Sequence, residues 1–363
     1  MRAAIEALTP YRVQSSAGFT LLDNNENFIN LLSSISPEDF KQNIEINRYP
    51  SDNISRLTEA YARYIGLPAE NILAGNGSDE WISLICQFVL DPGDYVALVD
   101  PDFSMYEKSA VIMGAYVVRI ALNDDFSLPV EKIVRAIEEY QPKCLFLSNP
   151  CNPTGRFYTN DEINRLSSVM KDVGGYFILD EAYIEFAGRS YGDQAMKEKH
   201  VIVLRTASKA LGMAGLRLGF FIANEELIRD VLRIKPPYNV NQLSSVLGAN
   251  LLEKRDLIQK SLSEQKQQIE ELRTVLYEFA SKHKGVTVYP SQTNFFLIET
   301  EQAKALYEFL YEKSVRVRYF GQGRLKNGLR ISAGTKEEMA ILRHYLMEWS
   351  QNDARGYTIS NNE

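Results

Sequence analysis

A single lysine stands among hydroxyls, alanines and glycines in the segment TASKALGMAGLRLGF, which runs from Thr206 to Phe220. Small residues of this kind leave room for a ligand to approach the backbone closely. The amine of Lys209 can condense with an aldehyde to form a Schiff base. Ser208 and Arg217 add a hydroxyl and a fixed positive charge, which suit a phosphate. The segment therefore predicts a site for a ligand that carries an aldehyde and a phosphate.

Further polar and aromatic side chains follow short apolar runs that are typical of strands buried on both faces. The runs are Tyr95–Val99, Cys144–Leu147, Tyr176–Leu179, Val201–Leu204 and Gly219–Ala223. The candidates that follow four of them are Phe103, Asn152, Asp180 with Tyr183, and Lys209. Ligands of open α/β sheets bind beyond the carboxyl ends of the strands. If these strands are neighbours, the candidates converge on one site.

The chemistry of these side chains suits a pyridine aldehyde. The Asp180 carboxylate can keep a pyridine nitrogen protonated, which makes the ring an electron sink. Tyr183 and Asn152 can hydrogen-bond a ring oxygen, and Phe103 can cover one face of the ring. The segment GNGSDEW places glycines and Ser78 before a helix, whose free N–H groups favour a phosphate.

Helix-like segments separate the apolar runs, for example Asp79–Leu90 and Asp161–Asp172. This alternation predicts an α/β fold with a mainly parallel sheet and helices on both faces. We expect an N-terminal segment (1–44) that joins the small domain, a large α/β domain (45–250), a small C-terminal α+β domain (251–352) and a flexible tail (353–363).

The chain after residue 250 is predicted to begin with one long helical connector, from Leu251 to His283. Strands and helices of the small domain should follow in the order strand, strand, helix, strand, strand, helix. Their expected ranges are 286–290, 294–298, 301–313, 315–320, 328–334 and 336–349.

Composition narrows the function classes. The 363 residues carry a net charge of −7, which argues against nucleic acid or an anionic membrane as the main partner. The three cysteines form no disulfide framework, and the three histidines have no partner at ligand spacing, so we expect a reducing compartment and no metal site. The N-terminus has no apolar signal core, and the longest apolar stretch, WISLICQFVL, is too short to span a bilayer. These features predict a cytoplasmic protein.

Several ordered motifs resemble one family. NPCNPTG, DEAY, SKALGMAGLRLGF and LRISAGT, with weaker matches at LTPY, NEN, RYP and GNGSDE, are similar to the class I and II aminotransferases, which are fold-type I pyridoxal-phosphate enzymes. The similarity is strongest to the members that act on histidinol phosphate, and it spans roughly residues 8 to 335. It implies a transaminase of histidine biosynthesis that uses pyridoxal 5′-phosphate and transfers an amino group to 2-oxoglutarate.

The resemblance also implies a role for each matching residue. Lys209 would bond to the cofactor and move the proton, Asp180 would pair the pyridine nitrogen, and Tyr183 would contact the ring oxygen. The other cofactor-binding residues would be Gly77, Ser78, Asp79, Phe103, Asn152, Ser208 and Arg217. The substrate-binding residues would be Arg330, Arg318, Tyr11 and Asn25. Tyr49 would reach the cofactor phosphate of the neighbouring subunit, so the resemblance implies a homodimer with shared active sites.

One departure from the family pattern bears on substrate choice. The family continues Asn-Glu-Asn with proline, an aromatic residue and glycine, whereas Phe28, Ile29 and Asn30 follow Asn27 in this chain. We also weigh three alternative functions: a lyase similar to threonine-phosphate decarboxylase, an aromatic amino acid aminotransferase, and a binding protein without catalysis. The presence of Lys209, Asp180 and Arg330 argues against the binding protein. For single residues, Asp180 could be a helix cap, and Arg318 and Arg330 could be structural charges.

Overall fold

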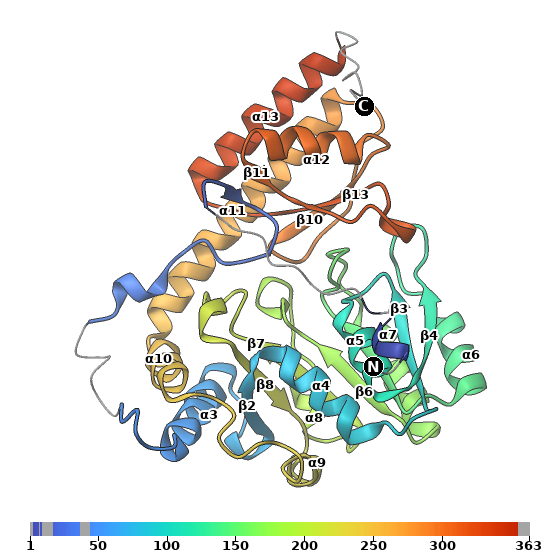
Figure 1. Cartoon of the computed structure of the whole chain (residues 1–363), viewed down its shortest axis with the longest axis vertical. Coiled ribbons are helices and arrows are strands. Elements are labelled where there is room, and N and C mark those ends of the chain that lie inside the picture. The colour runs from blue at the N-terminus through green and yellow to red at the C-terminus, as the bar shows by residue number, and fades with distance from the viewer. Residues whose placement is uncertain (1–2, 7, 9–16, 37–43, 355–363) are drawn as a thin grey trace.

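The fold is described from a computed structural model, which describes residues 3–6, 8, 17–36 and 44–354. A seven-stranded sheet occupies the lower part of the molecule in Figure 1, in the order β2-β8-β7-β6-β5-β3-β4. The strands are β2 (Ile72–Asn76), β3 (Tyr95–Asp100), β4 (Tyr116–Ala121), β5 (Cys144–Ser148), β6 (Tyr176–Asp180), β7 (Val201–Thr206) and β8 (Leu218–Ile222). Only β8 runs opposite to the other strands of this sheet, so the predicted mainly parallel sheet is confirmed.

Helices cover both faces of this sheet, as the alternation predicted. They are α3 (Ser51–Ile65), α4 (Gly77–Val89), α5 (Met105–Met113), α6 (Val130–Tyr140), α7 (Asn160–Asp172), α8 (Gly192–Ala195), α9 (Glu225–Val231) and α10 (Gln242–Glu253). Alternate residues of each central strand join different buried clusters, because successive side chains of a strand point to opposite faces. One cluster includes side chains of α3, α6, α7 and α10, and the other includes side chains of α4, α5 and α9.

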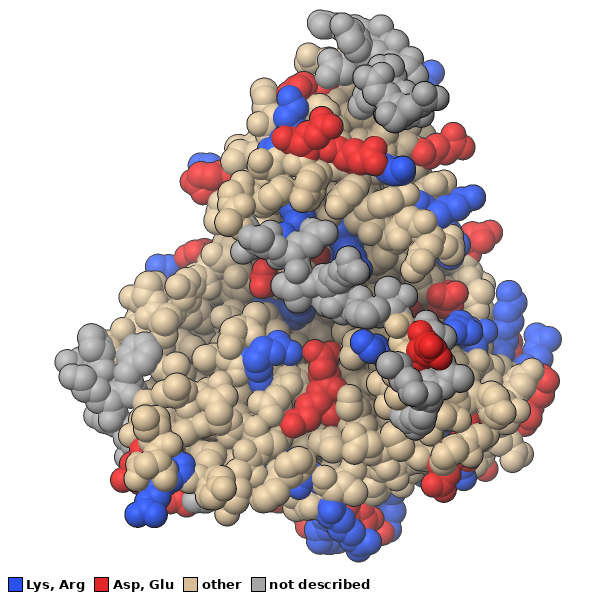
Figure 2. Space-filling model, in the orientation of Figure 1, with Lys and Arg blue, Asp and Glu red and all other residues tan. Residues whose placement is uncertain are grey.

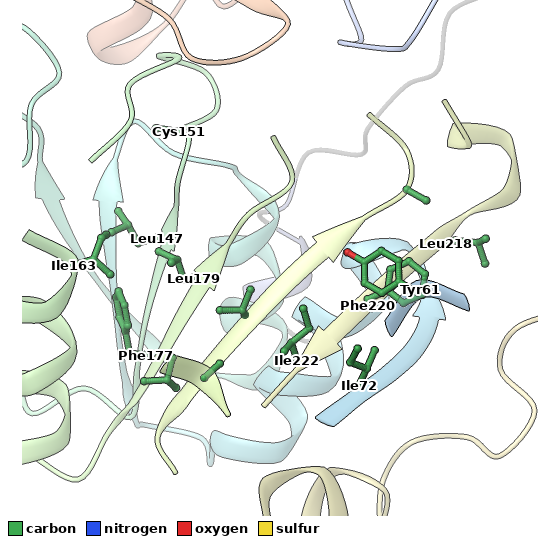
Figure 3. Close-up of a cluster of buried hydrophobic side chains, with 14 of the residues drawn as sticks. Tyr61, Ile72, Leu147, Cys151, Ile163, Phe177, Leu179, Leu218, Phe220 and Ile222 are labelled. Carbon is green, nitrogen blue, oxygen red and sulfur yellow. The ribbon is translucent and has the colours of Figure 1, made fainter. Parts of the chain in front are cut away.

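Figure 3 shows the first of these clusters. Leu179 of β6 and Phe220 of β8 point to the same side of the sheet, toward the helices that carry Ile163 and Tyr61. The rings of Tyr61 and Phe220 stack in parallel with their centroids 3.4 Å apart. Such close packing of large apolar side chains holds the strands in register. Because the strands are fixed, the strand ends that carry the candidate residues are fixed as well.

The C-terminal part forms the upper region of Figure 1. Its elements are α11 (Arg255–Lys282), β9 (Thr287–Val288), β10 (Phe295–Glu299), α12 (Ala303–Glu312), β11 (Val315–Arg316), β12 (Arg318–Tyr319), β13 (Gly328–Ser332) and α13 (Lys336–Ala354). The antiparallel order is β12-β13-β10-β9, and the N-terminal β1 (Thr20–Leu21) pairs in parallel with β11. A third buried cluster contains Leu22 together with side chains of α11, α12 and α13. The domain boundaries at residues 44 and 250 stay predictions.

Two expectations for this region were wrong. The predicted helix from Leu251 to His283 is interrupted at Lys254, whose ψ of 64° is not helical. The residues before the break belong to α10, which packs beside α3 and the large sheet. The predicted strand over 315–320 is divided, because β11 pairs with β1 whereas β12 pairs with β13.

The remaining described elements are short. They are α1 (Ala3–Glu6) and the 3₁₀ turns Leu31–Ser34, Ala69–Asn71, Ile184–Phe186, Ala214–Leu216 and Gly323–Leu325. Figure 2 shows basic and acidic side chains interspersed over one face of the molecule. Among the described residues, no helix combines the length and apolar character that crossing a membrane requires, and no cluster of metal-ligating side chains occurs.

Candidate active site

The carboxyl ends of β5, β6 and β7 open into a cavity of about 200 Å³. The candidates that line it are Asn25, Ser78, Asp79, Phe103, Asn152, Asp180, Tyr183, Ser208, Lys209, Arg217 and Arg330. The structure therefore brings together side chains from strand ends, from the first turn of α4 and from the N-terminal segment.

Asp180 is the last residue of β6, and Lys209 follows the neighbouring strand β7. The Lys209 Nζ donates a hydrogen bond to the Asn24 carbonyl oxygen at 2.8 Å. The buried Asp180 accepts hydrogen bonds from the Tyr106 hydroxyl at 2.8 Å and from the Ala182 N–H at 3.0 Å. Burial nevertheless raises the pKa of Asp180 to about 6, because desolvation disfavours the carboxylate more than these donors favour it. A cationic ring nitrogen would relieve that cost.

The N-terminus of α4 forms a cup with Ser208 and Arg217. The Arg217 Nη1 lies 3.5 Å from the Ser208 Oγ, and Nη2 lies 3.2 Å from the Asp79 carboxylate. Gly77 has a φ of 75°, and a Cβ there would lie 2.8 Å from the Arg217 Nη2. Glycine thus lets the guanidinium approach the helix N-terminus, where the first N–H groups have no intrahelical partners. Both features fit a phosphate group.

Hydrogen bonds connect several of the candidates to one another and to the N-terminal segment. The Asn25 side-chain N–H donates to the Tyr183 hydroxyl at 2.8 Å. The Arg330 Nη1 donates to the Asn152 Oδ1 at 2.5 Å, and its Nη2 donates to the Asp23 carbonyl at 2.6 Å. Arg330 is therefore held between the cofactor-binding candidates and the N-terminal segment.

A second cavity, of about 480 Å³, adjoins the first and shares Asn24, Phe103, Asn152 and Arg330 with it. Arg318 lines this second cavity. Arg318 and Arg330 are directly opposite each other in the antiparallel pair β12–β13, so their side chains leave the same face of the sheet. The two guanidiniums therefore face one cavity.

Of the described candidates, Gly77 and Tyr49 are not among the residues that line these cavities, although Gly77 contributes to the cup beside Arg217. Tyr49 is 76% exposed in the single chain and stacks on Tyr238, with ring centroids 4.6 Å apart. Tyr11 lies outside the described residues. Sequence reasoning also missed Tyr106 and Asn24. Tyr106 could have been predicted, because it lies only three residues after Phe103, near the start of a helix. No sequence signal pointed to the Asn24 carbonyl.

Comparisons with known proteins give the family. The sequence model described as "Aminotransferase class I and II" matches residues 18–346. The chain is 38% identical to the histidinol-phosphate aminotransferase of Clostridium novyi over 93% of each chain. It is 36% identical to the Clostridium kluyveri protein of the same name, over 92% of this chain and 94% of that one. The chain belongs to the class I and II aminotransferases.

A solved structure agrees on the fold. The histidinol-phosphate aminotransferase of Sinorhizobium meliloti, in complex with pyridoxal-5′-phosphate, has a TM-score of 0.86 at 21% identity, over 97% of this chain and 98% of that one. As a class I and II aminotransferase, the chain is an enzyme that depends on pyridoxal 5′-phosphate, which confirms the predicted cofactor. The residues present fit this cofactor: an amine at Lys209, a buried carboxyl at Asp180 and a cup beside Gly77.

Proposed function

We propose that this aminotransferase exchanges the amino group of histidinol phosphate with 2-oxoglutarate in histidine biosynthesis. The names of its relatives support this substrate. The observation that carries the proposal is the pair Arg318 and Arg330, opposite each other on β12–β13 and facing one cavity. Like charges placed opposite in a sheet repel each other, and an anion between them removes that cost. Both substrates supply one: a phosphate on the first and carboxylates on the second.

The cofactor supplies an aldehyde and a ring that accepts electrons. In our proposal, Asp180 keeps the ring nitrogen protonated, Phe103 covers one ring face, and Asn152 and Tyr183 hold the ring oxygen. The cup of Gly77, Ser78, Asp79, Ser208 and Arg217 would hold the cofactor phosphate. The Lys209 Nζ would bond to the cofactor aldehyde with release of water, and the incoming substrate amine would displace it. The freed Lys209 amine would then take the proton from the substrate carbon that carries the amine and return it during transfer.

We further propose that two copies of the chain share their active sites, in the cytoplasm. Tyr49 and Tyr238 form a stacked pair that the single chain leaves 76% and 46% exposed, and Ile46 and Leu243 nearby in sequence are also exposed. Exposed apolar residues of this kind favour a protein partner. A twofold dimer would let each subunit supply Tyr49 to the other. The three cysteines are buried and free, which supports a reducing compartment.

The central experiment follows the visible absorbance of the bound cofactor after histidinol phosphate is added, and then after 2-oxoglutarate is added. We expect the band to disappear with the first substrate and to return with the second. Release of CO2 from threonine phosphate without a need for an oxo acid would instead indicate a lyase. A preference for phenylalanine or tyrosine would refute the substrate assignment and leave the family.

Replacing Arg318 by glutamine should raise KM for histidinol phosphate about tenfold to hundredfold, because a hydrogen bond to a charged group is lost. KM for phenylalanine should rise less, since its carboxylate offers fewer acceptor oxygens than a phosphate and can still be held by Arg330. Arg318→Lys is the matched control and should retain part of the affinity, because it keeps the charge but not the planar donor pair. Steady-state kinetics with both substrates measure the contrast. Equal increases for both substrates would assign Arg318 a structural role.

Mixing two inactive variants should restore activity if Tyr49 acts in the neighbouring site. Lys209→Ala and Tyr49→Ala are unfolded and refolded together, and random pairing makes about half of the dimers mixed. Each mixed dimer then contains one intact site, so about a quarter of all sites should be active. Lys209→Ala mixed with Asp180→Asn is the negative control, because both lesions affect the same chain's site. No recovery from the Tyr49 mixture, with wild-type protein refolding normally, would refute the shared site.

A further inference from the structure

The larger cavity has walls of opposite charge. Arg318 and Arg330 line it from the C-terminal sheet, whereas Asp100 lines it from the end of β3 and Asp102 from the loop that follows. A third guanidinium on the basic wall, Arg324, is already paired with the Glu299 carboxylate at 2.7 Å. A ligand that fills this cavity therefore meets cations at one end and carboxylates at the other. An anionic group joined to a hydrogen-bond donor matches both walls.

Asp102 is the more enclosed of the two acidic residues. Its Oδ1 accepts hydrogen bonds from the Phe103 N–H at 2.7 Å and from the Ser148 hydroxyl, and its Oδ2 accepts the Ser148 N–H at 3.1 Å. An ionised carboxylate offers about four acceptor sites. These contacts use three of them, so Oδ2 can still accept a donor from a ligand in the cavity.

The surroundings of Asp102 make such a donor favourable. Burial raises the pKa of Asp102 to about 7, against the effect of its three hydrogen bonds. The carboxylate is therefore poorly solvated, and one more donor would stabilise it. The wall that carries Asp102 also carries Phe103 and Asn152, which both cavities share. A substrate ring that extends from the reacting amine along this wall would pass the carboxylate.

We propose that Asp102 is a specificity-determining residue, which accepts a hydrogen bond from the ring N–H of the substrate imidazole while Arg318 and Arg330 hold the phosphate. This inference rests on the proposed function, because histidinol phosphate carries both groups. A benzene ring of similar size offers no donor and leaves the carboxylate without its fourth partner. The wild-type enzyme should therefore favour the imidazole over a phenyl ring about tenfold to hundredfold.

A purely structural role for Asp102 would change the kinetics of all substrates in the same way. Ser148, which donates to Asp102, also accepts the Asn152 N–H at 3.1 Å, so Asp102 helps to hold the loop that carries Asn152. Disturbing that loop would slow the reaction of every substrate by the same factor. Recognition of the imidazole would affect only substrates with a ring N–H.

The test compares histidinol phosphate with phenylalaninol phosphate, which has the same amine and phosphate but a benzene ring. Asp102→Asn should lower kcat/KM for histidinol phosphate at least tenfold and change that for phenylalaninol phosphate about twofold or less. Asp100→Asn is the matched control, because it removes the same charge two residues away, and it should leave the ratio of the two substrates unchanged. Arg318→Gln should lower kcat/KM for both substrates by the same factor.

Two measurements keep the proposal testable if Asp102→Asn folds poorly. Wild-type enzyme should use ring N-methylated histidinol phosphate at least tenfold less efficiently, because the neutral methylated ring has no N–H. Calorimetric titration of Lys209→Ala protein with histidinol phosphate and phenylalaninol phosphate should show the same preference without turnover. Equal affinities, parallel losses in Asp102→Asn, or a changed ratio in Asp100→Asn alone would overturn the assignment of Asp102. If the wild-type enzyme were inactive on histidinol phosphate, the proposed function would be refuted as well. The activity of the wild-type enzyme therefore distinguishes a failure of the proposed function from a failure of the Asp102 assignment alone.

Discussion

Replacing Lys209 by alanine is expected to lower turnover at least about 10⁴-fold, because the variant lacks both the covalent attachment and the proton-transfer group. Lys209 is the only lysine among the described residues that line the smaller cavity. No neighbouring amine is therefore available to replace it. The variant should still bind the cofactor without a covalent bond, through Asp180 and the cup around Arg217.

Steady-state transamination and the visible spectrum together check this expectation. Lys260→Ala removes an exposed lysine from α11 and serves as the control, with an expected rate equal to that of the wild type. Circular dichroism should show the same fold for both variants. A Lys209→Ala enzyme that keeps more than about a hundredth of the wild-type rate would contradict the proton-transfer role.

The central strands could be predicted from the sequence because they are buried on both faces. Every residue of β5 and β7 is buried, and each strand begins with four consecutive apolar residues that are visible in the sequence. Within the seven-stranded sheet, the two strands that were not predicted, β2 and β4, have weaker sequence signals. β4 lies at the edge of the sheet with Tyr116 exposed, and β2 contains Gly75, which lacks a side chain to mark a strand.

The site was predictable to the extent that it lies at strand ends. Asp180 ends β6 and Lys209 follows β7, and parallel neighbours bring such residues to one edge of the sheet. Contacts that depend on distant segments could not be predicted in this way. The Asn24 carbonyl lies 185 positions from Lys209 in the sequence, and it reaches the amine through the pairing of β1 with β11. The break at Lys254 likewise follows from packing of α10 on the large sheet, because the local composition stays helical.

The Asp180 carboxylate should be nearly as important as Lys209. Replacing Asp180 by asparagine should lower turnover at least about hundredfold, because removing one partner of a buried charge pair costs about 3–5 kcal/mol. The amide cannot keep the pyridine nitrogen protonated, so the ring is a weaker electron sink. A rate near that of the wild type would mean that Asp180 only caps the turn at Ala182, whose N–H it accepts at 3.0 Å.

The pH dependence of cofactor binding provides an independent measurement of the same residue. Pyridoxamine 5′-phosphate has no aldehyde, so its affinity reports the cup and Asp180 without a covalent bond to Lys209. The folded pKa of Asp180 is raised from 3.8 to about 6, so its ionisation makes the cofactor-free protein less stable as the pH rises through that range. Pairing with a protonated ring nitrogen needs the ionised form. Binding should therefore strengthen from pH 5 to pH 7 by about tenfold relative to Asp180→Asn, and change little above that.

The hydrogen bond from Tyr106 allows the direction of this effect to be tested. The Tyr106 hydroxyl donates to Asp180 at 2.8 Å and lowers the pKa of that carboxyl, while the Tyr106 ring stacks on Phe146 with centroids 5.0 Å apart. Tyr106→Phe keeps the stacked ring and removes the donor, so the pKa of Asp180 should rise further. The midpoint of the binding curve should then move to higher pH, whereas the cofactor's own ionisations, measured with Asp180→Asn, should stay where they are. A midpoint that does not move in Tyr106→Phe would show that the titration belongs to another group, because only Asp180 loses a hydrogen-bond donor in that variant.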